Sequence, residues 1–215
     1  MFVAVPLPSA ATEEVIEIVD TVRAMPLPAG ARDVRWVRLD GLHLTLRFLG
    51  PTEPDRVDPT ADAVARAART ATGPFEAELQ GAGAFPSGRR PRTLWIGMGR
   101  GVDELGRLAG MTSEALEAVG WPRDARPFRP HLTLARSDGV SVGPLVAERL
   151  ATAMADRRIG WSVESLGLFE SITGGGPARY LPVALHPLAG SPGADGDVYH
   201  HRAPDLSEVE SRIDS

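Results

Sequence analysis

The chain has 215 residues, of which 43% are hydrophobic, and a formal net charge of −5 at pH 7, so it is long and apolar enough to bury one substantial core. It contains no cysteine and no lysine, and all 23 basic residues are arginines. This composition excludes disulfide frameworks, thiolate metal sites, cysteine nucleophiles, the lysine of a phosphate-binding P-loop and intermediates that join a nucleotide covalently to lysine.

The first half of the chain alternates short apolar runs with amphipathic stretches of helical periodicity. The predicted elements are, in chain order, strand 2–7, helix 11–25, strands 33–39 and 42–49, helix 54–71, and strands 74–84 and 92–99. Asp40-Gly41 lies between two of these strands and is typical of a hairpin turn. We therefore expect strands 33–39 and 42–49 to form a hairpin.

The second half repeats this alternation. Its predicted elements are helix 102–119, strand 130–136, helix 143–156, and strands 158–171 and 178–186. Beyond Pro187 the chain is rich in glycine, proline, serine and acidic residues, and residues 191–215 carry six acidic side chains and two arginines. We expect one domain over residues 1–190 and an acidic flexible tail over 191–215.

The sequence gives no sign of membrane insertion or export. No run approaches the roughly 18 apolar residues that span a bilayer. The first ten residues, MFVAVPLPSA, lack the basic region and the long apolar region of a signal peptide. We expect a cytoplasmic, monomeric protein without membrane association.

The tetrapeptide HLTL occurs twice, at residues 43–46 and 131–134, once in each half of the chain. By chance, a repeated His-tetrapeptide is expected on the order of a few times per thousand such chains. Side chains at i and i+2 of a strand share one face, about 6.6 Å apart. Each copy therefore directs its histidine and threonine to one face and its two leucines to the other. The leucines are expected to pack on the core, and the polar pairs to line a groove.

Two histidines and two hydroxyls in one groove suit acid–base catalysis at a phosphate. Imidazole titrates at about pH 6.5, so one ring can accept a proton while the other donates one. Each such transfer is worth about 10²–10⁴-fold in rate. Threonine hydroxyls can donate hydrogen bonds to phosphate oxygens, and Arg136, five residues after His131, is a candidate for neutralising the developing charge.

HLTLRF and HLTLAR resemble the paired H-x-T-x motifs of the two-histidine phosphoesterase superfamily. Four longer segments are similar to those of its RNA 2′,3′-cyclic phosphodiesterase family, also called the bacterial 2′-5′ RNA ligase or LigT-like family. They are RWVRLDGLHLTLRFLG, FPSGRRPRTLWIGM, PFRPHLTLAR and SLGLFESITGGGPARYLPVALHPL, in the family's order. The resemblance covers about residues 1–188 and leaves out the tail.

The resemblance implies a bilobal α+β fold of the LigT-like type. In this fold, two antiparallel sheets with flanking helices surround a central cleft. The two sheets are related by a pseudo-two-fold duplication. It also implies hydrolysis of an RNA 2′,3′-cyclic phosphate to a 2′-phosphate without metal or cofactor, and a reverse 2′-5′ ligation. His43 and His131 are the implied catalytic residues, and Thr45, Thr133 and Arg136 the implied phosphate-binding residues. We take His43 as the acid and His131 as the base, and the reverse assignment stays open until a substrate pose is known.

Further RNA contacts are expected outside the motifs. Phe48 matches the apolar position of the first motif and is a candidate to stack on a base, although packing in the core is the more common role of such a ring. Arg89, Arg90 and Arg92 form the densest basic cluster, for which RNA backbone contacts and a solvated turn weigh about evenly. The expected partner is RNA with a 2′,3′-cyclic phosphate end, including tRNA fragments.

Three other functions stay open at this point. The same site would also suit another small cyclic phosphate, such as ADP-ribose cyclic phosphate or a cyclic nucleotide. A non-catalytic RNA- or nucleotide-binding module would use the same scaffold, but the intact histidine and threonine in both motifs argue against it. A zinc hydrolase has the least support, because no third ligand stands at metal-site spacing from the two histidines.

Overall fold

The structure is a computed structural model that describes residues 1–29, 34–138, 141–174, 177–191 and 199–200. The strands are β1 (Phe2–Pro6), β2 (Arg35–Trp36), β3 (His43–Phe48), β4 (Phe75–Phe85), β5 (Thr93–Arg100), β6 (Leu132–Arg136), β7 (Arg158–Val163), β8 (Ser165–Ile172), β9 (Arg179–Pro187) and β10 (Tyr199–His200). The helices are α1 (Ser9–Arg23), α2 (Val57–Thr70), α3 (Val102–Glu117) and α4 (Gly143–Ala153), with 3-10 turns at Leu39–Gly41 and Pro54–Arg56.

The strands form one curled sheet in the order β10-β9-β8-β1-β3-β6-β5-β4-β7, with β2 also paired to β6. We call β9, β8, β1 and β3 the first half-sheet and β6, β5, β4 and β7 the second half-sheet. Every pairing is antiparallel, and the halves meet where Leu44 of β3 pairs with Leu132 of β6. The predicted α+β fold is confirmed, and the two expected sheets are continuous through this junction.

The predicted duplication is visible in the strand register. Where β1 pairs with β3, one step along β1 corresponds to two along β3, so Leu46 is an extra, bulged residue. The same irregularity occurs where β5 pairs with β6, and there the bulged residue is Leu134. Each bulge follows the threonine of an HLTL segment, so the two motif strands share the same local geometry.

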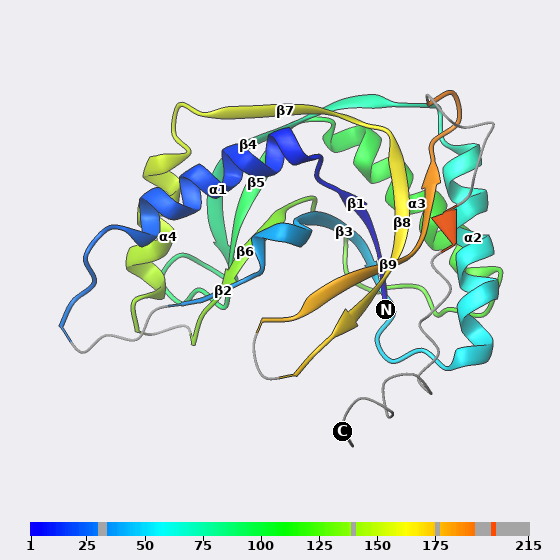
Figure 1. The fold of residues 1–215 in the computed structure, drawn as a ribbon, viewed down its shortest axis with the longest axis horizontal. Coiled ribbons are helices and arrows are strands. Elements are labelled where there is room, and N and C mark those ends of the chain that lie inside the picture. Colours follow the sequence, from blue (N-terminus) through cyan, green and yellow to red (C-terminus); the bar gives the residue numbers. More distant parts are fainter. Residues whose placement is uncertain (30–33, 139–140, 175–176, 192–198, 201–215) are drawn as a thin grey trace, which may run out of the picture.

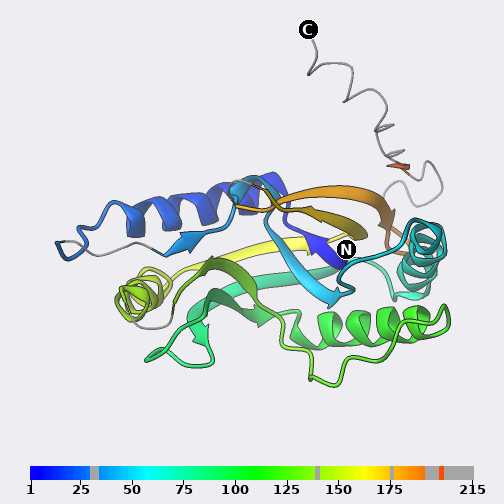
Figure 2. The ribbon, with the colours of Figure 1, turned by 90° about the horizontal axis from the view of Figure 1, so that it is seen from below.

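The α-helices of the described residues form two pairs at opposite ends of the sheet (Figure 1). Helix α1 contacts α4, and α2 contacts α3. Figure 2, turned by 90°, shows the strands curling between these pairs. The helices cover the sheet with apolar faces, as with Val15, Ile18, Val19 and Val22 of α1, which are buried.

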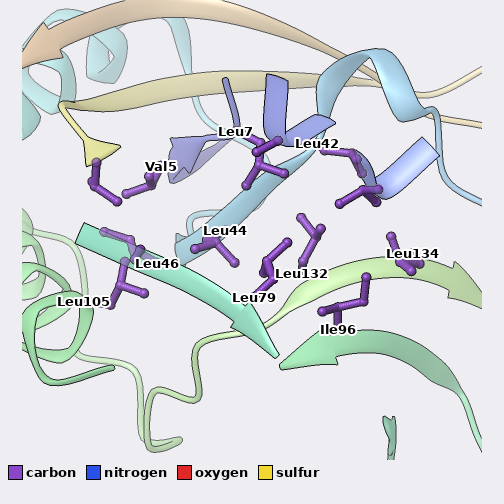
Figure 3. Packing of buried hydrophobic residues seen from close by; sticks show 14 of the residues in the cluster. Val5, Leu7, Leu42, Leu44, Leu46, Leu79, Ile96, Leu105, Leu132 and Leu134 are labelled. Atoms are coloured by element: carbon purple, nitrogen blue, oxygen red, sulfur yellow. The ribbon is translucent and has the colours of Figure 1, made fainter. Parts of the chain in front are cut away.

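The leucines of both motifs lie in the core between the two halves (Figure 3). Leu44, Leu132 and Leu134 are 0% exposed, and Leu46 is 8% exposed. Burying one such side chain contributes about 1.5–3 kcal/mol. The apolar side chains labelled around the junction are Val5, Leu7, Leu42, Leu44, Leu46, Leu79, Ile96, Leu105, Leu132 and Leu134. This packing fixes which face of each motif strand turns away from the core.

Two sequence predictions about strands are wrong. Residues 33–39 and 42–49 do not form a hairpin, because β2 and β3 both pair with β6 and a 3-10 turn joins them. The turn contains Asp40, whose carboxylate is held by the Arg38 guanidinium. The predicted strand 158–171 is divided at Glu164 into β7, which pairs with β4, and β8, which pairs with β1 and β9.

The carboxy-terminal segment lies largely outside the described residues. Within it, Tyr199 and His200 pair with β9, and residues 192–198 and 201–215 are not described. The domain boundary at residue 190 and the flexible acidic tail therefore stay predictions. Over the described part of the chain, none of the helices has the length and apolar character needed to cross a bilayer.

The duplicated register predicts matched effects of two glycine substitutions. A Cβ at residue 83 would lie 2.6 Å from the Trp95 ring, and one at residue 167 would lie 2.5 Å from the Phe169 ring. We expect Gly83→Ala and Gly167→Ala each to lower the free energy of unfolding by about 1–3 kcal/mol, measured by urea denaturation. Gly106→Ala on α3 is the control, because a Cβ at this position would have no heavy atom within 4 Å. Alanine is also the better helix former, so we expect this variant to be more stable by about 0.5–1 kcal/mol. Unchanged unfolding midpoints at both sheet positions would contradict this packing.

Candidate active site

The junction of the half-sheets brings the two His/Thr pairs together. Leu44 and Leu132, which pair there, point into the core, and their sequence neighbours on both strands point to the opposite face. His43 and Thr45 therefore share a face with His131 and Thr133, and the antiparallel register sets each histidine beside the other strand's threonine. All four are partly exposed. This shared face is the candidate active site.

Both imidazoles are held by the same backbone contact. The Nδ1 of His43 lies 2.8 Å from the carbonyl oxygen of Gly41, and the Nδ1 of His131 lies 2.7 Å from that of Arg129. A carbonyl oxygen only accepts, so Nδ1 carries the proton in both rings. In the neutral form, each ring then has its free lone pair on Nε2. Both histidines are therefore oriented as proton acceptors at Nε2.

The site environment disfavours the charged form of both rings. Burial lowers the pKa of His43 below its ordinary value, with the Gly41 carbonyl acting in the opposite direction. Burial also lowers the pKa of His131, and the positive charge of Arg136 lowers it further. Both histidines are thus predominantly neutral at pH 7 in the free protein. Only His131 has a cation that contributes to this shift.

Aromatic rings from distant segments surround His43. The Phe2 ring stacks on it with centroids 4.6 Å apart, and the Tyr180 ring meets it edge-on at 4.8 Å. Phe2 in turn stacks on Phe169 at 5.5 Å. Sequence reasoning missed these three residues, because they reach the site only through the pairing of β1, β8 and β9. The register across β1 and β3 pairs Phe2 with Phe48, so no pattern in the sequence links the Phe2 ring to His43.

His131 has aromatic support from the second half-sheet. The Phe85 ring lies edge-on at 5.1 Å between centroids, and the Trp95 ring lies at 6.3 Å. Trp95 pairs with Thr133 across β5 and β6, so its side chain shares the face of the site. The two rings limit rotation of the imidazole. Each catalytic candidate is therefore oriented by one backbone carbonyl and by aromatic neighbours.

The two bulges turn the fifth residue after each histidine onto the same face. With strict alternation, Phe48 and Arg136 would point to the core side. The bulges at Leu46 and Leu134 reverse the alternation, so both side chains line the site. Phe48 is 60% exposed, and the Arg136 Nη1 donates to the Thr93 hydroxyl at 3.2 Å.

The shared face contains a cavity of about 550 Å³. Its lining includes His43, Thr45, Phe48, Thr133, Arg136 and Tyr180. His131 is absent from the lining, because its ring lies against Phe85 and Trp95 at the margin of the cavity. Four of the five expected catalytic and phosphate-binding residues therefore line the cavity. The strand register places the fifth, His131, on the same face.

The predicted arginine cluster lies outside the cavity. Arg89, Arg90 and Arg92 are exposed in the connection between β4 and β5, and none of them lines the cavity. The backbone of Arg92 is nevertheless adjacent to the end of β6, since its carbonyl oxygen accepts from the Ser137 amide at 3.1 Å. The structure thus brings Arg92 near the site and leaves Arg89 and Arg90 at the periphery.

Arg47 connects the two motif strands, and sequence reasoning missed it. It is 8% exposed, its Nη2 donates to the Pro122 carbonyl oxygen, and its Nη1 lies 3.7 Å from the Asp124 carboxylate. Pro122 and Asp124 belong to the segment that leads into His131. Arg47, from the first motif strand, therefore anchors the approach to the second.

The described part of the chain offers no set of metal ligands that would support the zinc hydrolase alternative. There, no group of three or more histidine, cysteine, aspartate or glutamate side chains is arranged to hold a metal ion. The two motifs and Arg136 supply two imidazoles, two hydroxyls and one guanidinium. These groups can exchange protons and bind a phosphate.

Comparison with known proteins gives consistent matches. The family profile described as the 2′-5′ RNA ligase superfamily matches residues 7–175. An RNA 2′,3′-cyclic phosphodiesterase from Aeropyrum pernix is 35% identical over 141 residues, which cover 65% of this chain and 77% of that protein. An RNA 2′,3′-cyclic phosphodiesterase from Escherichia coli is 30% identical over 187 residues, which cover 85% of this chain and 93% of that protein. The crystal structure of E. coli LigT complexed with 3′-AMP superimposes with a TM-score of 0.65 at 27% identity, covering 87% and 96%.

The position of Arg136 predicts a specific change in the titration of His131. We expect both imidazoles to titrate below the ordinary histidine pKa in the free protein, as followed by NMR. Arg136→Gln removes a cation that opposes protonation, so the pKa of His131 should rise while that of His43 changes less. Arg69→Gln is the matched control, because it also removes one positive charge, from an exposed position on α2. An unchanged or lower pKa for His131 in Arg136→Gln would rule out this electrostatic coupling.

Proposed function

The chain belongs to the 2′-5′ RNA ligase superfamily, and from this premise we propose that it hydrolyses RNA 2′,3′-cyclic phosphate ends to 2′-phosphate ends. The observation that carries the proposal is the convergence of two His/Thr pairs on one face, each histidine with its Nε2 free. The relatives from A. pernix and E. coli, both RNA 2′,3′-cyclic phosphodiesterases, support the same reaction and substrate.

In the proposed mechanism, His131 is the base and His43 the acid. The Nε2 of His131 takes a proton from water, whose oxygen attacks phosphorus in line with the ribose 3′-oxygen. The bond from phosphorus to that oxygen breaks, and protonated His43 delivers a proton to it, leaving a 3′-hydroxyl and a 2′-phosphate. The charge of Arg136 favours neutral His131, which supports its assignment as the base. The anionic substrate favours protonation of His43, because an opposite charge raises the pKa of a histidine.

The hydroxyls and the guanidinium complete the site. Thr45 and Thr133 donate hydrogen bonds to the two non-bridging oxygens, and Arg136 balances the charge that develops on them. Strain in the five-membered cyclic ester assists departure of the 3′-oxygen. With that strain, two proton-transfer groups and a guanidinium, the proposed reaction needs no metal ion or organic cofactor.

The proposed substrate is an RNA strand, tRNA fragments included. The exposed ring of Phe48 would stack on the terminal base, and the arginines at residues 89, 90 and 92 would contact the RNA backbone. Both His/Thr pairs come from one chain, so we propose a monomer as the active species. RNA as substrate favours a cytoplasmic location.

The same groups also serve ligation, the reverse of cleaving a 2′-5′ linkage. With a 5′-hydroxyl in place of water, the histidines keep their roles: His131 takes the proton of the hydroxyl, His43 protonates the leaving 3′-oxygen, and the cyclic end is joined through a 2′-5′ linkage without ATP. The absence of lysine from the chain fits this route, since no nucleotidyl-lysine is required. We propose ligation as a minor activity of the same site.

The proposal predicts turnover of cyclic-ended RNA in the presence of EDTA. We expect an oligonucleotide with a 2′,3′-cyclic phosphate to give only the 2′-phosphate, identified by chromatography against both phosphate isomers. His43→Ala and His131→Ala should each lower kcat by about 10²–10⁴-fold, because each removes one proton transfer.

Three outcomes would contradict parts of the mechanism. Full activity in either histidine variant would refute two-histidine catalysis. Loss of activity in EDTA, restored by a divalent metal, would refute metal independence. A 3′-phosphate product would reverse the assignment of the leaving oxygen.

The threonines provide a more conservative test of phosphate binding. Thr133→Val keeps the shape of the side chain and removes its hydroxyl, while Thr133→Ser keeps the hydroxyl. We expect Thr133→Val to lower kcat/KM by about tenfold or more, and Thr133→Ser to restore most of it, because a hydrogen bond to a charged group contributes about 1.5–3 kcal/mol. Equal losses in the two variants would indicate a packing role instead.

A further inference from the structure

The two halves of the site have the same backbone geometry but opposite chemistry. In the first half-sheet, one register row across β3, β1 and β8 consists of Phe48, Phe2 and Phe169. The equivalent row across β6, β5 and β4 consists of Arg136, Thr93 and Phe85. One margin of the cavity is therefore aromatic, and the other carries a cation.

Strand β2 extends the cationic row by one residue. Arg35 pairs with Arg136 across β2 and β6, so the two side chains share a face. Val37, two residues further and on that same face, lines the cavity. Both arginines are exposed, and no acidic side chain in the described ranges forms an ion pair with either. Like charges directly opposite each other destabilise a sheet, and a bound anion would relieve the repulsion.

On the first half-sheet, Arg179 of β9 is exposed between the cavity-lining residues Ala178 and Tyr180, and after Arg38 it helps to lower the pKa of the Asp40 carboxyl. Glu170, which is exposed, lines the cavity on that side. Arg38 also lines it, but its Nη2 and Nε are bound to the Asp40 carboxylate. A polyanion would be repelled by Glu170 and attracted by Arg35, which has no acidic partner among the described residues.

We infer that the RNA strand leaves the site across the second half-sheet, where Arg35 binds the phosphodiester on the 5′ side of the terminal nucleotide. This inference rests on the proposed function. Neighbouring strands lie about 4.8 Å apart, and arginine side chains are long, so Arg136 and Arg35 can hold successive phosphates. The terminal base then lies toward Phe48 on the aromatic margin. The site therefore selects oligonucleotides over cyclic mononucleotides.

The test compares a tetranucleotide ending in a 2′,3′-cyclic phosphate with adenosine 2′,3′-cyclic monophosphate. The proteins are wild type, Arg35→Gln, Arg35→Lys and the control Arg69→Gln. We expect wild type to have a lower KM for the tetranucleotide, and Arg35→Gln to reduce this preference about tenfold. Arg35→Lys should retain most of it, because the cation is kept. Arg69→Gln, with the same change of charge on α2, should behave as wild type.

A binding measurement separates this inference from the proposed function. Fluorescence anisotropy of a labelled tetranucleotide ending in a 2′-phosphate needs no turnover. Arg35→Gln should lower the slope of log Kd against log salt concentration by about 0.7, the contribution of one phosphate contact in a single strand. Arg69→Gln should leave the slope unchanged.

The outcomes are distinguishable. If wild type hydrolyses neither substrate, the proposed function fails, while the salt slope still decides the role of Arg35. If wild type hydrolyses both with the same KM, or if Arg35→Gln raises both KM values by the same factor, the binding role of Arg35 is overturned. An unchanged salt slope in Arg35→Gln also overturns it.

Discussion

The burial of Leu44 against Leu132 is the constraint on which the active-site geometry depends, since these residues form the pair that joins the half-sheets. A slip of one residue in either motif strand would move its leucines to the cavity and its histidine into the core. The apolar contact therefore holds the strand register, and the register places the catalytic groups. In this way, a hydrophobic interaction controls the positions of polar side chains that it does not touch.

The period of two in each HLTL segment was enough to predict the polar and apolar faces of both motif strands. Local periodicity also predicted the four helices. It could not identify the rings of Phe2 and Tyr180 beside His43, because their positions depend on pairing between segments distant in sequence. Nor could it show that bulges turn Phe48 and Arg136 to the site, since bulges break the alternation used for the prediction. The prediction of a hairpin at Asp40-Gly41 was wrong for a related reason. The flanking strands β2 and β3 both pair with β6, and this tertiary pairing overrode the local turn signal.

Burial and catalysis make opposite demands on the two imidazoles. The aromatic surroundings fix both rings but also favour their neutral forms, which suits a base and opposes an acid. A negatively charged substrate resolves this conflict, because it adds the opposite charge that protonation of His43 requires. Binding of a phosphate thus favours the charged form of His43. Proton transfer and substrate binding are coupled through this local charge.

The division of one long apolar segment at Glu164 has a consequence for biosynthesis. Because β7 completes the second half-sheet and β8 crosses to the first, β1 pairs with a strand that is translated more than 100 residues later. Such non-local pairing closes slowly and leaves strand edges open meanwhile. A nascent chain that stops before Phe169 and Tyr180 has both histidines in its sequence but lacks two of the rings that enclose His43. The rings of Phe169 and Tyr180 thus reach His43 only after both HLTL segments have been translated.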